Sequence, residues 1–160
     1  MDEYGRVIPA PNRFPSASDG KGFGPIAEYI HNKGLKFGIH IMRGIPRQAV
    51  TQNVKIKGTE YTARQVAHPA SICCWNSDMY GLDCTKPGAQ EYYDSLLELY
   101  ASWGVDFIKV DDICVKYGRT NDESTLAYGG DEIEMLRRAI DKCGRPIVLK
   151  PFLRDRQCLG

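Results

Sequence analysis

The sequence predicts an α/β fold built on parallel strands. Three amphipathic segments each end at a glycine and lead into a short apolar run, which is the pattern of repeated helix-to-strand units. The apolar runs FGIHI, FIKV and PIVL suit strands that are covered on both faces of a sheet. Because a helix separates successive strands, the strands are expected to run parallel.

The first unit is a helix over residues 25–33 followed by a strand over residues 35–41. Tyr29 and Ile30 lie on the apolar face of this helix, and Gly34 has the position at which helices commonly terminate. The glycine-rich segment GKGFG before the helix is interpreted as a turn.

The second unit begins near Pro87, a residue type favoured in the first turn of a helix. An i, i+3, i+4 stripe of aromatic and aliphatic residues follows: Ala89, Tyr92, Tyr93, Leu96, Leu97, Tyr100 and Trp103. The stripe predicts a helix that ends at Gly104 and continues into a strand over residues 105–111. The third unit is a helix over about residues 131–144 and a strand over residues 146–149.

The connection between the first strand and the second helix, residues 42–86, is unusually long. Such connections normally have roughly two to six residues. This one leaves the carboxyl end of a strand, where α/β sheets and barrels place their ligand sites. No glycine-rich phosphate-binding motif follows any predicted strand, so no nucleotide is expected.

The composition favours one globular domain with small or neutral partners. The chain has 160 residues and a formal net charge of +1, which provides no field for gathering nucleic acid or anionic lipid. No apolar stretch approaches the roughly 20 residues that span a bilayer, and the first residues lack an export-signal pattern. We therefore expect no nucleic-acid partner, no membrane contact and, because the six cysteines lack zinc spacing, no metal site. Whether cysteines form disulfides or remain thiols stays open.

The segment WGVDFIKVDDIC places carboxylates at the end of the second predicted strand. Side chains alternate along a strand, so Lys109 and Asp111 share one face. A lysine beside a carboxylate at the mouth of a parallel strand favours the ionised form that a nucleophile needs. A salt bridge between the two side chains that merely caps the strand is the alternative.

The long connection carries a group of residues of the kind that binds sugars, namely Trp75, Asn76, Asp78 and Tyr80. Aromatic faces pack against the C–H patches of sugar rings, and polar tips bind hydroxyl groups. Ordinary packing within a loop is the alternative for the two aromatic residues.

Other polar residues near the strand ends are interpreted as structural. His40 is expected to be a core residue, and Asp112 is expected to cap the loop that follows it. Arg43 and Arg47 are expected to be solvated loop charges.

Three runs of the sequence carry a family resemblance: NRFPSASDGKGFGPIAEYIHNKGLKFGIHI, YGLDCTKPGAQEYYDSLLELYASWGVDFIKVDD and EIEMLRRAIDKCGRPIVL. They resemble the α-galactosidase (melibiase) family, family 27 of the glycoside hydrolases. The motifs R-F-P, H-x-K-G-L-K-F-G-I, W-G-V-D-F-x-K-x-D and R-P-I-V follow one another in family order. The resemblance extends over nearly the whole chain.

The resemblance implies a (β/α)8 TIM barrel, of which residues 1–149 would be a part with about three parallel strands. It implies a retaining hydrolase that removes terminal α-D-galactosyl groups from oligosaccharides. The family nucleophile is the aspartate of a K-x-D motif, here Asp111, and the lysine, here Lys109, contacts the sugar. The family's third βα loop lines the sugar pocket, and the residues in that place are Trp75, Asp78 and Tyr80. No cofactor is expected, because the chemistry needs only two carboxyl groups and water.

The sequence also departs from the family. The family's general acid/base lies after the sixth strand and has no counterpart here, so the chain alone is expected to be impaired or inactive. Residues 150–160 do not resemble the family, which suggests a reading-frame change or a truncated gene model around Lys150. The family pairs a cysteine two positions after the nucleophile with one in the third loop. Here the cysteine comes one position later, so a bridge from Cys114 to Cys73 or Cys74 is not expected.

Two alternatives to the α-galactosidase hypothesis stay open. In the first alternative, the parent enzyme is an α-N-acetylgalactosaminidase or a β-L-arabinopyranosidase, since the sugars that these enzymes release share the ring positions contacted from this region. The second is an inactive remnant of the barrel that binds sugar. By family habit the parent is expected to be extracellular or periplasmic.

Overall fold

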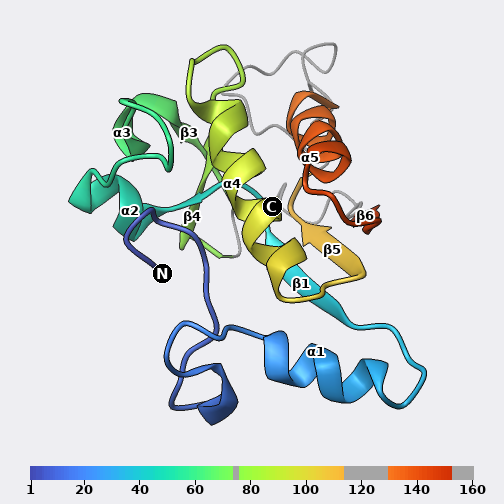
Figure 1. Cartoon of the computed structure of the whole chain (residues 1–160). Coiled ribbons are helices and arrows are strands. Elements are labelled where there is room, and N and C mark those ends of the chain that lie inside the picture. Colours follow the sequence, from blue (N-terminus) through green and yellow to red (C-terminus); the bar gives the residue numbers. More distant parts are fainter. Residues whose placement is uncertain (74–75, 114–129, 153–160) are drawn as a thin grey trace.

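A computed structural model describes residues 1–73, 76–113 and 130–152 of the chain (Figure 1). Its parallel sheet has three strands in the order β1 (Gly38–Met42), β5 (Phe107–Asp111) and β6 (Val148–Pro151). The helices that precede these strands are α1 (Gly24–His31), α4 (Ala89–Ser102) and α5 (Gly130–Lys142). A short 3-10 helix, η1 (Pro15–Ala17), lies before α1. The three predicted helix-to-strand units and their parallel pairing are confirmed.

All three helices are followed by a glycine in the left-handed backbone region. Gly34, Gly104 and Gly144 have φ angles of 75°, 81° and 76°, which a residue without a Cβ adopts at little cost. The strand β6 continues through Pro151, so the first residues of the predicted atypical tail pair with β5. The reading-frame change stays a prediction, and residues 153–160 lie outside the described residues.

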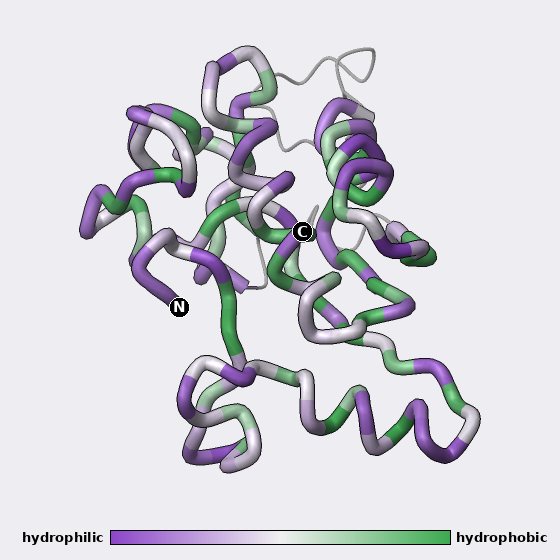
Figure 2. Tube along the Cα trace, in the orientation of Figure 1, coloured by the Kyte–Doolittle hydropathy of each residue, from purple (hydrophilic) through white to green (hydrophobic). Residues whose placement is uncertain are grey.

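The core lies where α4 and α5 cover one face of the parallel sheet. Ile108 and Val110 of β5 are fully buried there, together with most of the predicted stripe of α4. Phe107 and Lys109 alternate with them and are only partly buried, as the strand periodicity predicts. Along α1, Figure 2 shows hydrophobic positions interspersed with hydrophilic ones, but Tyr29, which was predicted on the apolar face, is 65% exposed. No helix in the described part of the chain is long and apolar enough to span a membrane.

The long connection is not the plain loop that the sequence predicted. It forms α2 (Arg47–Gln52), α3 (Ala63–Val66) and an antiparallel sheet in the order β2 (Ile45–Pro46), β4 (Met79–Leu82) and β3 (Ala67–Ile72). These strands are short, and the edge strand β3 contains Pro69 and a register shift between His68 and Ile72. Such interruptions remove the alternation of apolar and polar residues by which strands are recognised in a sequence. Because β2 follows β1 almost directly, the second sheet begins at the carboxyl end of the first.

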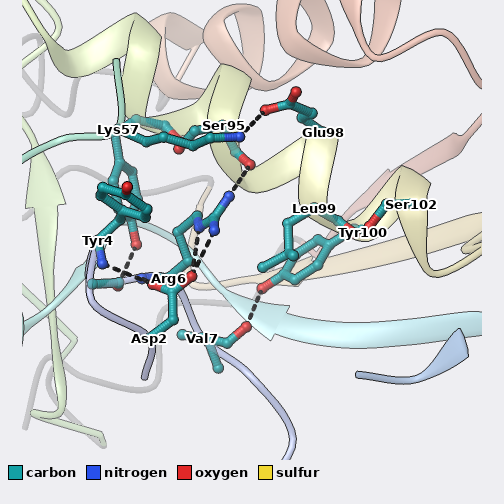
Figure 3. Close-up of polar contacts among 12 residues, drawn as sticks. Asp2, Tyr4, Arg6, Val7, Lys57, Ser95, Glu98, Leu99, Tyr100 and Ser102 are labelled. Carbon is teal, nitrogen blue, oxygen red and sulfur yellow. Dashed lines mark hydrogen bonds and ion pairs between the residues drawn. The ribbon is translucent and has the colours of Figure 1, made fainter. Parts of the chain in front are cut away.

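Polar contacts hold the first residues of the chain on α4 (Figure 3). Arg6 is buried, pairs with the carboxylate of Asp2 at 2.7 Å and donates to the carbonyl of Ser95 at 3.1 Å. The Tyr100 hydroxyl donates to the carbonyl of Val7 at 3.3 Å. These contacts hold the segment that precedes α1 against helix α4.

Asp106, just before β5, joins the loops of all three units. Its carboxylate accepts the Phe37 N–H at 2.8 Å and the Arg145 guanidinium at 2.6 Å, and it lies 2.7 Å from Nε2 of His31. Burial alone would raise the pKa of Asp106, but the hydrogen bonds from Phe37, His31 and Arg145 together hold that pKa well below its usual range.

Replacing Asp106 with asparagine is expected to destabilise the chain by about 1–3 kcal/mol at neutral pH, because the donors lose a charged acceptor. The folded-state pKa is depressed, so this stabilisation is present above the unfolded pKa of about 4 and is lost as pH falls below it. Urea unfolding at pH 7 and pH 3 should therefore show a smaller difference between the two proteins at pH 3. A difference in unfolding free energy between the two proteins that is the same at pH 7 and pH 3 would contradict the stabilising role of the ionised Asp106 carboxylate.

Candidate active site

Asp111 is the last residue of β5 and lies at the carboxyl edge of the parallel sheet, as predicted. The residue is 7% exposed. Its Oδ1 accepts the backbone N–H of Asp112 at 2.9 Å, and its Oδ2 lies 3.2 Å from Nε2 of His40. One carboxylate oxygen is thus held by the backbone, while the other faces a side chain that is half exposed to solvent.

His40 was expected in the core, and that expectation is wrong. Its side chain is 52% exposed and lies on the sheet face opposite to the core. The isoleucines on either side of it, Ile39 and Ile41, are the residues that pack against the core. The register pairs His40 with Lys109 and Met42 with Asp111, which brings the imidazole to the carboxylate. Strand register cannot be read from one sequence, so this contact escaped prediction.

Lys109 shares the face of Asp111, as the alternation predicted. Its ammonium lies 4.2 Å from the ring centroid of Phe152, within the range of a cation–π interaction. The sheet face below the nucleophile candidate therefore carries a positive charge. Contact between Lys109 and a sugar stays a prediction.

The predicted sugar-binding group is only partly placed. Trp75 lies outside the described residues. Tyr80 belongs to β4, is half-buried, and has the Arg47 guanidinium 5.1 Å from its ring centroid. Asp78 is exposed and lines a surface cavity of about 440 Å³ together with the first residues of the chain, and Asp111 is not among the residues that line it. The sugar contacts of these residues remain predictions.

Arg43 was expected to be solvated, and the structure instead buries it beside Asp111. Its guanidinium donates to the carbonyl of Asp112, pairs with the Asp112 carboxylate at 3.2 Å, and pairs with Glu132 at 3.4 Å. The side chains of all three residues are at most 6% exposed. The backbone N–H of Arg43 donates to the Asp111 carbonyl at 3.1 Å. Arg43 is buried because two carboxylates compensate its charge.

Glu132, in the first turn of α5, gathers donors from several elements. Its carboxylate accepts the Leu82 N–H at 2.7 Å and the Tyr93 hydroxyl at 3.3 Å, besides the guanidinium. The Tyr93 oxygen itself accepts the Gly44 N–H at 2.8 Å. Burial raises the pKa of Tyr93 well above its usual value, and the charge of Glu132 adds to the effect, so the hydroxyl remains a donor. Sequence reasoning missed Glu132, because an acidic residue in a first turn is commonplace.

Asp112 is part of this buried cluster and is not the simple loop cap that was expected. Burial raises its pKa, and the negative charge of Asp111 adds to this, whereas Arg43 and a hydrogen bond from Cys73 act in the opposite direction. Its φ of 57° is uncommon for a residue with a side chain. The predicted absence of a bridge between Cys114 and Cys73 or Cys74 concerns residues that lie in part outside those described.

The described ranges contain no group of three or more His, Cys, Asp or Glu side chains arranged to hold a metal ion. The Asp111 carboxylate is the candidate reactive group of the site, with one oxygen held by the Asp112 N–H and the other near His40. A buried carboxylate with one oxygen held by a backbone N–H and the other near a half-exposed side chain is suited to nucleophilic attack.

Comparisons with known proteins support a glycosidase barrel. No family model matches the chain. The family 27 β-L-arabinopyranosidase of Geobacillus stearothermophilus is 61% identical with a TM-score of 0.88, over 96% of this chain and 34% of the solved one. A variant of that enzyme has been solved with arabinose.

Curated relatives point the same way. Alpha-galactosidase 3 of Hypocrea jecorina is 30% identical over 152 residues, which are 93% of this chain and 22% of the relative. Alpha-N-acetylgalactosaminidase of Gallus gallus is 27% identical over 92% of this chain and 24% of the relative. The chain thus spans about a third of the solved relative and under a quarter of these curated ones.

Proposed function

This chain belongs to glycoside hydrolase family 27 and forms part of its (β/α)8 barrel, and we propose that it supplies the nucleophile of a retaining glycosidase. The observation that carries the proposal is the placement of Asp111. Its carboxylate ends a parallel strand at the edge where barrel enzymes have their active sites, with Oδ1 held by Asp112 and Oδ2 turned toward His40.

In the proposed first step, Oδ2 of Asp111 attacks the anomeric carbon of the substrate. The bond from that carbon to the leaving oxygen breaks, and a second carboxyl group protonates the leaving oxygen. The same second group then removes a proton from water, which attacks the anomeric carbon and releases Asp111. Two displacements at one carbon retain its configuration.

The second carboxyl group must lie about 5 Å from Asp111 in a retaining enzyme. Asp112 and Glu132 do not suit this role, because both are buried and engaged by the Arg43 guanidinium. We therefore propose that the acid/base belongs to the part of the barrel that the relatives have and this chain does not span.

The proposed substrates are terminal α-D-galactosyl groups of oligosaccharides, with β-L-arabinopyranosides as the second candidate. The likeness to alpha-galactosidase 3 supports the first candidate, and the 61% identity to a β-L-arabinopyranosidase supports the second. The two sugars share their ring configuration and differ by the hydroxymethyl group at C5 of galactose. Lys109, Trp75, Asp78 and Tyr80 are the proposed sugar contacts from this chain.

Hydrolysis of three nitrophenyl glycosides tests the substrate, using the product of the full reading frame that contains this sequence. Because one small substituent is worth about 1–3 kcal/mol, we expect the α-D-galactoside and the β-L-arabinopyranoside to differ by roughly 10–200-fold in kcat/KM. The α-N-acetylgalactosaminide is the third compound, because the chain is also 27% identical to an alpha-N-acetylgalactosaminidase. Sugar binding without turnover of any of the three would favour the inactive remnant instead.

A further inference from the structure

We propose that Arg43 is a positioning residue for Asp111, an inference that rests on the proposed function of that carboxylate. Arg43 contacts Asp112 at both its carbonyl oxygen and its carboxylate. The N–H of the same Asp112 is the donor that holds Oδ1 of Asp111. Fixing Asp112 therefore fixes one oxygen of the nucleophile and leaves the other oriented toward the substrate side.

The guanidinium is itself held in place from two sides. Glu132 of α5 pairs with Nη1 at 3.4 Å, and Gly81 on the other side has no Cβ to occupy the space beside the same atom. A Cβ added to Gly81 would be 2.3 Å from Nη1 and 2.7 Å from the Ser71 hydroxyl oxygen. A side chain at residue 81 would therefore force the guanidinium or Ser71 to move from its present position.

A purely packing role does not account for a charged group at this place. Apolar side chains of similar volume often stabilise a core as well as a buried ion pair does. The planar fork of arginine, in contrast, presents donors to several acceptors in fixed directions. It thereby holds Asp112 in its left-handed conformation, with a φ of 57°, which a residue with a side chain seldom adopts without support.

Orientation of the nucleophile is worth a large factor in rate. A misplacement of about 1 Å at a reacting group costs on the order of 100-fold. Displacing Arg43 should therefore slow formation of the glycosyl-enzyme by roughly 10–100-fold while leaving sugar binding nearly unchanged.

Amide hydrogen exchange by NMR on the 160-residue chain tests the proposal without requiring activity. Two variants displace the guanidinium in different ways. Arg43→Lys keeps the buried charge but not the fork, and Gly81→Ala keeps the arginine and intrudes on its Nη1 atom. The control is Arg138→Met, which removes an exposed arginine and its ion pair with Glu134 on α5.

In both test variants the Asp112 amide should exchange at least about 10-fold faster, while the amides of Ile108 and Val110 inside β5 keep their protection. The control should leave all three amides unchanged. An Asp112 amide that stays protected in both variants overturns the proposal. Equal loosening of Asp112 and of the β5 amides also overturns it, because Arg43 would then act only on overall stability.

A parallel measurement separates this inference from the proposed function. A mechanism-based fluorosugar should label a barrel completed with the remaining segments of the Geobacillus enzyme roughly 10–100-fold more slowly in either variant. If Arg43→Lys changes the Asp112 amide as expected but the unmodified barrel is never labelled, the proposed function fails and the positioning geometry stands. Labelling at the unmodified rate in both variants contradicts the positioning role.

Discussion

Asp111→Asn is expected to lower kcat/KM by about 1,000-fold or more in a completed barrel, in which residues 1–149 of this chain replace the matching segment of the Geobacillus β-L-arabinopyranosidase. The amide oxygen of asparagine is neutral and does not form the covalent bond to the anomeric carbon. The substitution is nearly isosteric, so Oδ1 can still accept the Asp112 N–H. The substitution should therefore lower kcat/KM while the barrel stays folded.

Steady-state hydrolysis of the nitrophenyl β-L-arabinopyranoside measures this loss, with circular dichroism confirming that the variant is folded. Asp141→Asn is the matched control, since that carboxylate is exposed on α5 and pairs only with a neighbouring arginine in the described ion pairs. The control should retain full activity. A folded Asp111→Asn barrel with more than a tenth of the original kcat/KM would show that another group attacks the sugar.

Glu132→Ala is expected to destabilise the chain by about 3–5 kcal/mol. The substitution leaves the Leu82 N–H and the Tyr93 hydroxyl without this acceptor, and it leaves the buried Arg43 with a single carboxylate partner among the contacts described above. Each of these groups is far from water, so the full cost of desolvation applies.

Urea unfolding of the 160-residue chain measures the effect. Glu134→Ala on the same helix serves as the comparison, because Glu134 is 58% exposed and pairs with Arg138 at the surface. Its loss should cost less than about 1 kcal/mol. Similar midpoints for the two variants would mean that the buried cluster contributes no more than a surface pair.

Much of the fold follows from sequence, because its signals are local. The stripe of α4 and the glycine at residue 104 are both readable within a few positions of the chain. The alternation of Ile108 and Val110 with Lys109 is equally local, and it placed the Asp111 carboxylate at the strand end. The family resemblance then led to the proposal that Asp111 is the nucleophile.

The surroundings of Asp111 follow from contacts between distant segments, which carry no local signal. Arg43 meets Asp112 across 69 positions of sequence and Glu132 across 89. An arginine after a strand is ordinarily solvated, and only the tertiary structure shows that two carboxylates enclose this one. The short strands of the second sheet were missed for a similar reason, since Pro69 interrupts the pattern that defines β3.

Covalent labelling of the completed barrel with a mechanism-based fluorosugar, followed by tryptic digestion and mass spectrometry, tests the assignment of the nucleophile most directly. Cleavage after Lys109 releases the peptide of residues 110–116, VDDICVK, which contains both adjacent aspartates. The account predicts that this peptide carries the sugar and that fragmentation places it on Asp111. A sugar attached to Asp112, or to any residue outside this peptide, would contradict it.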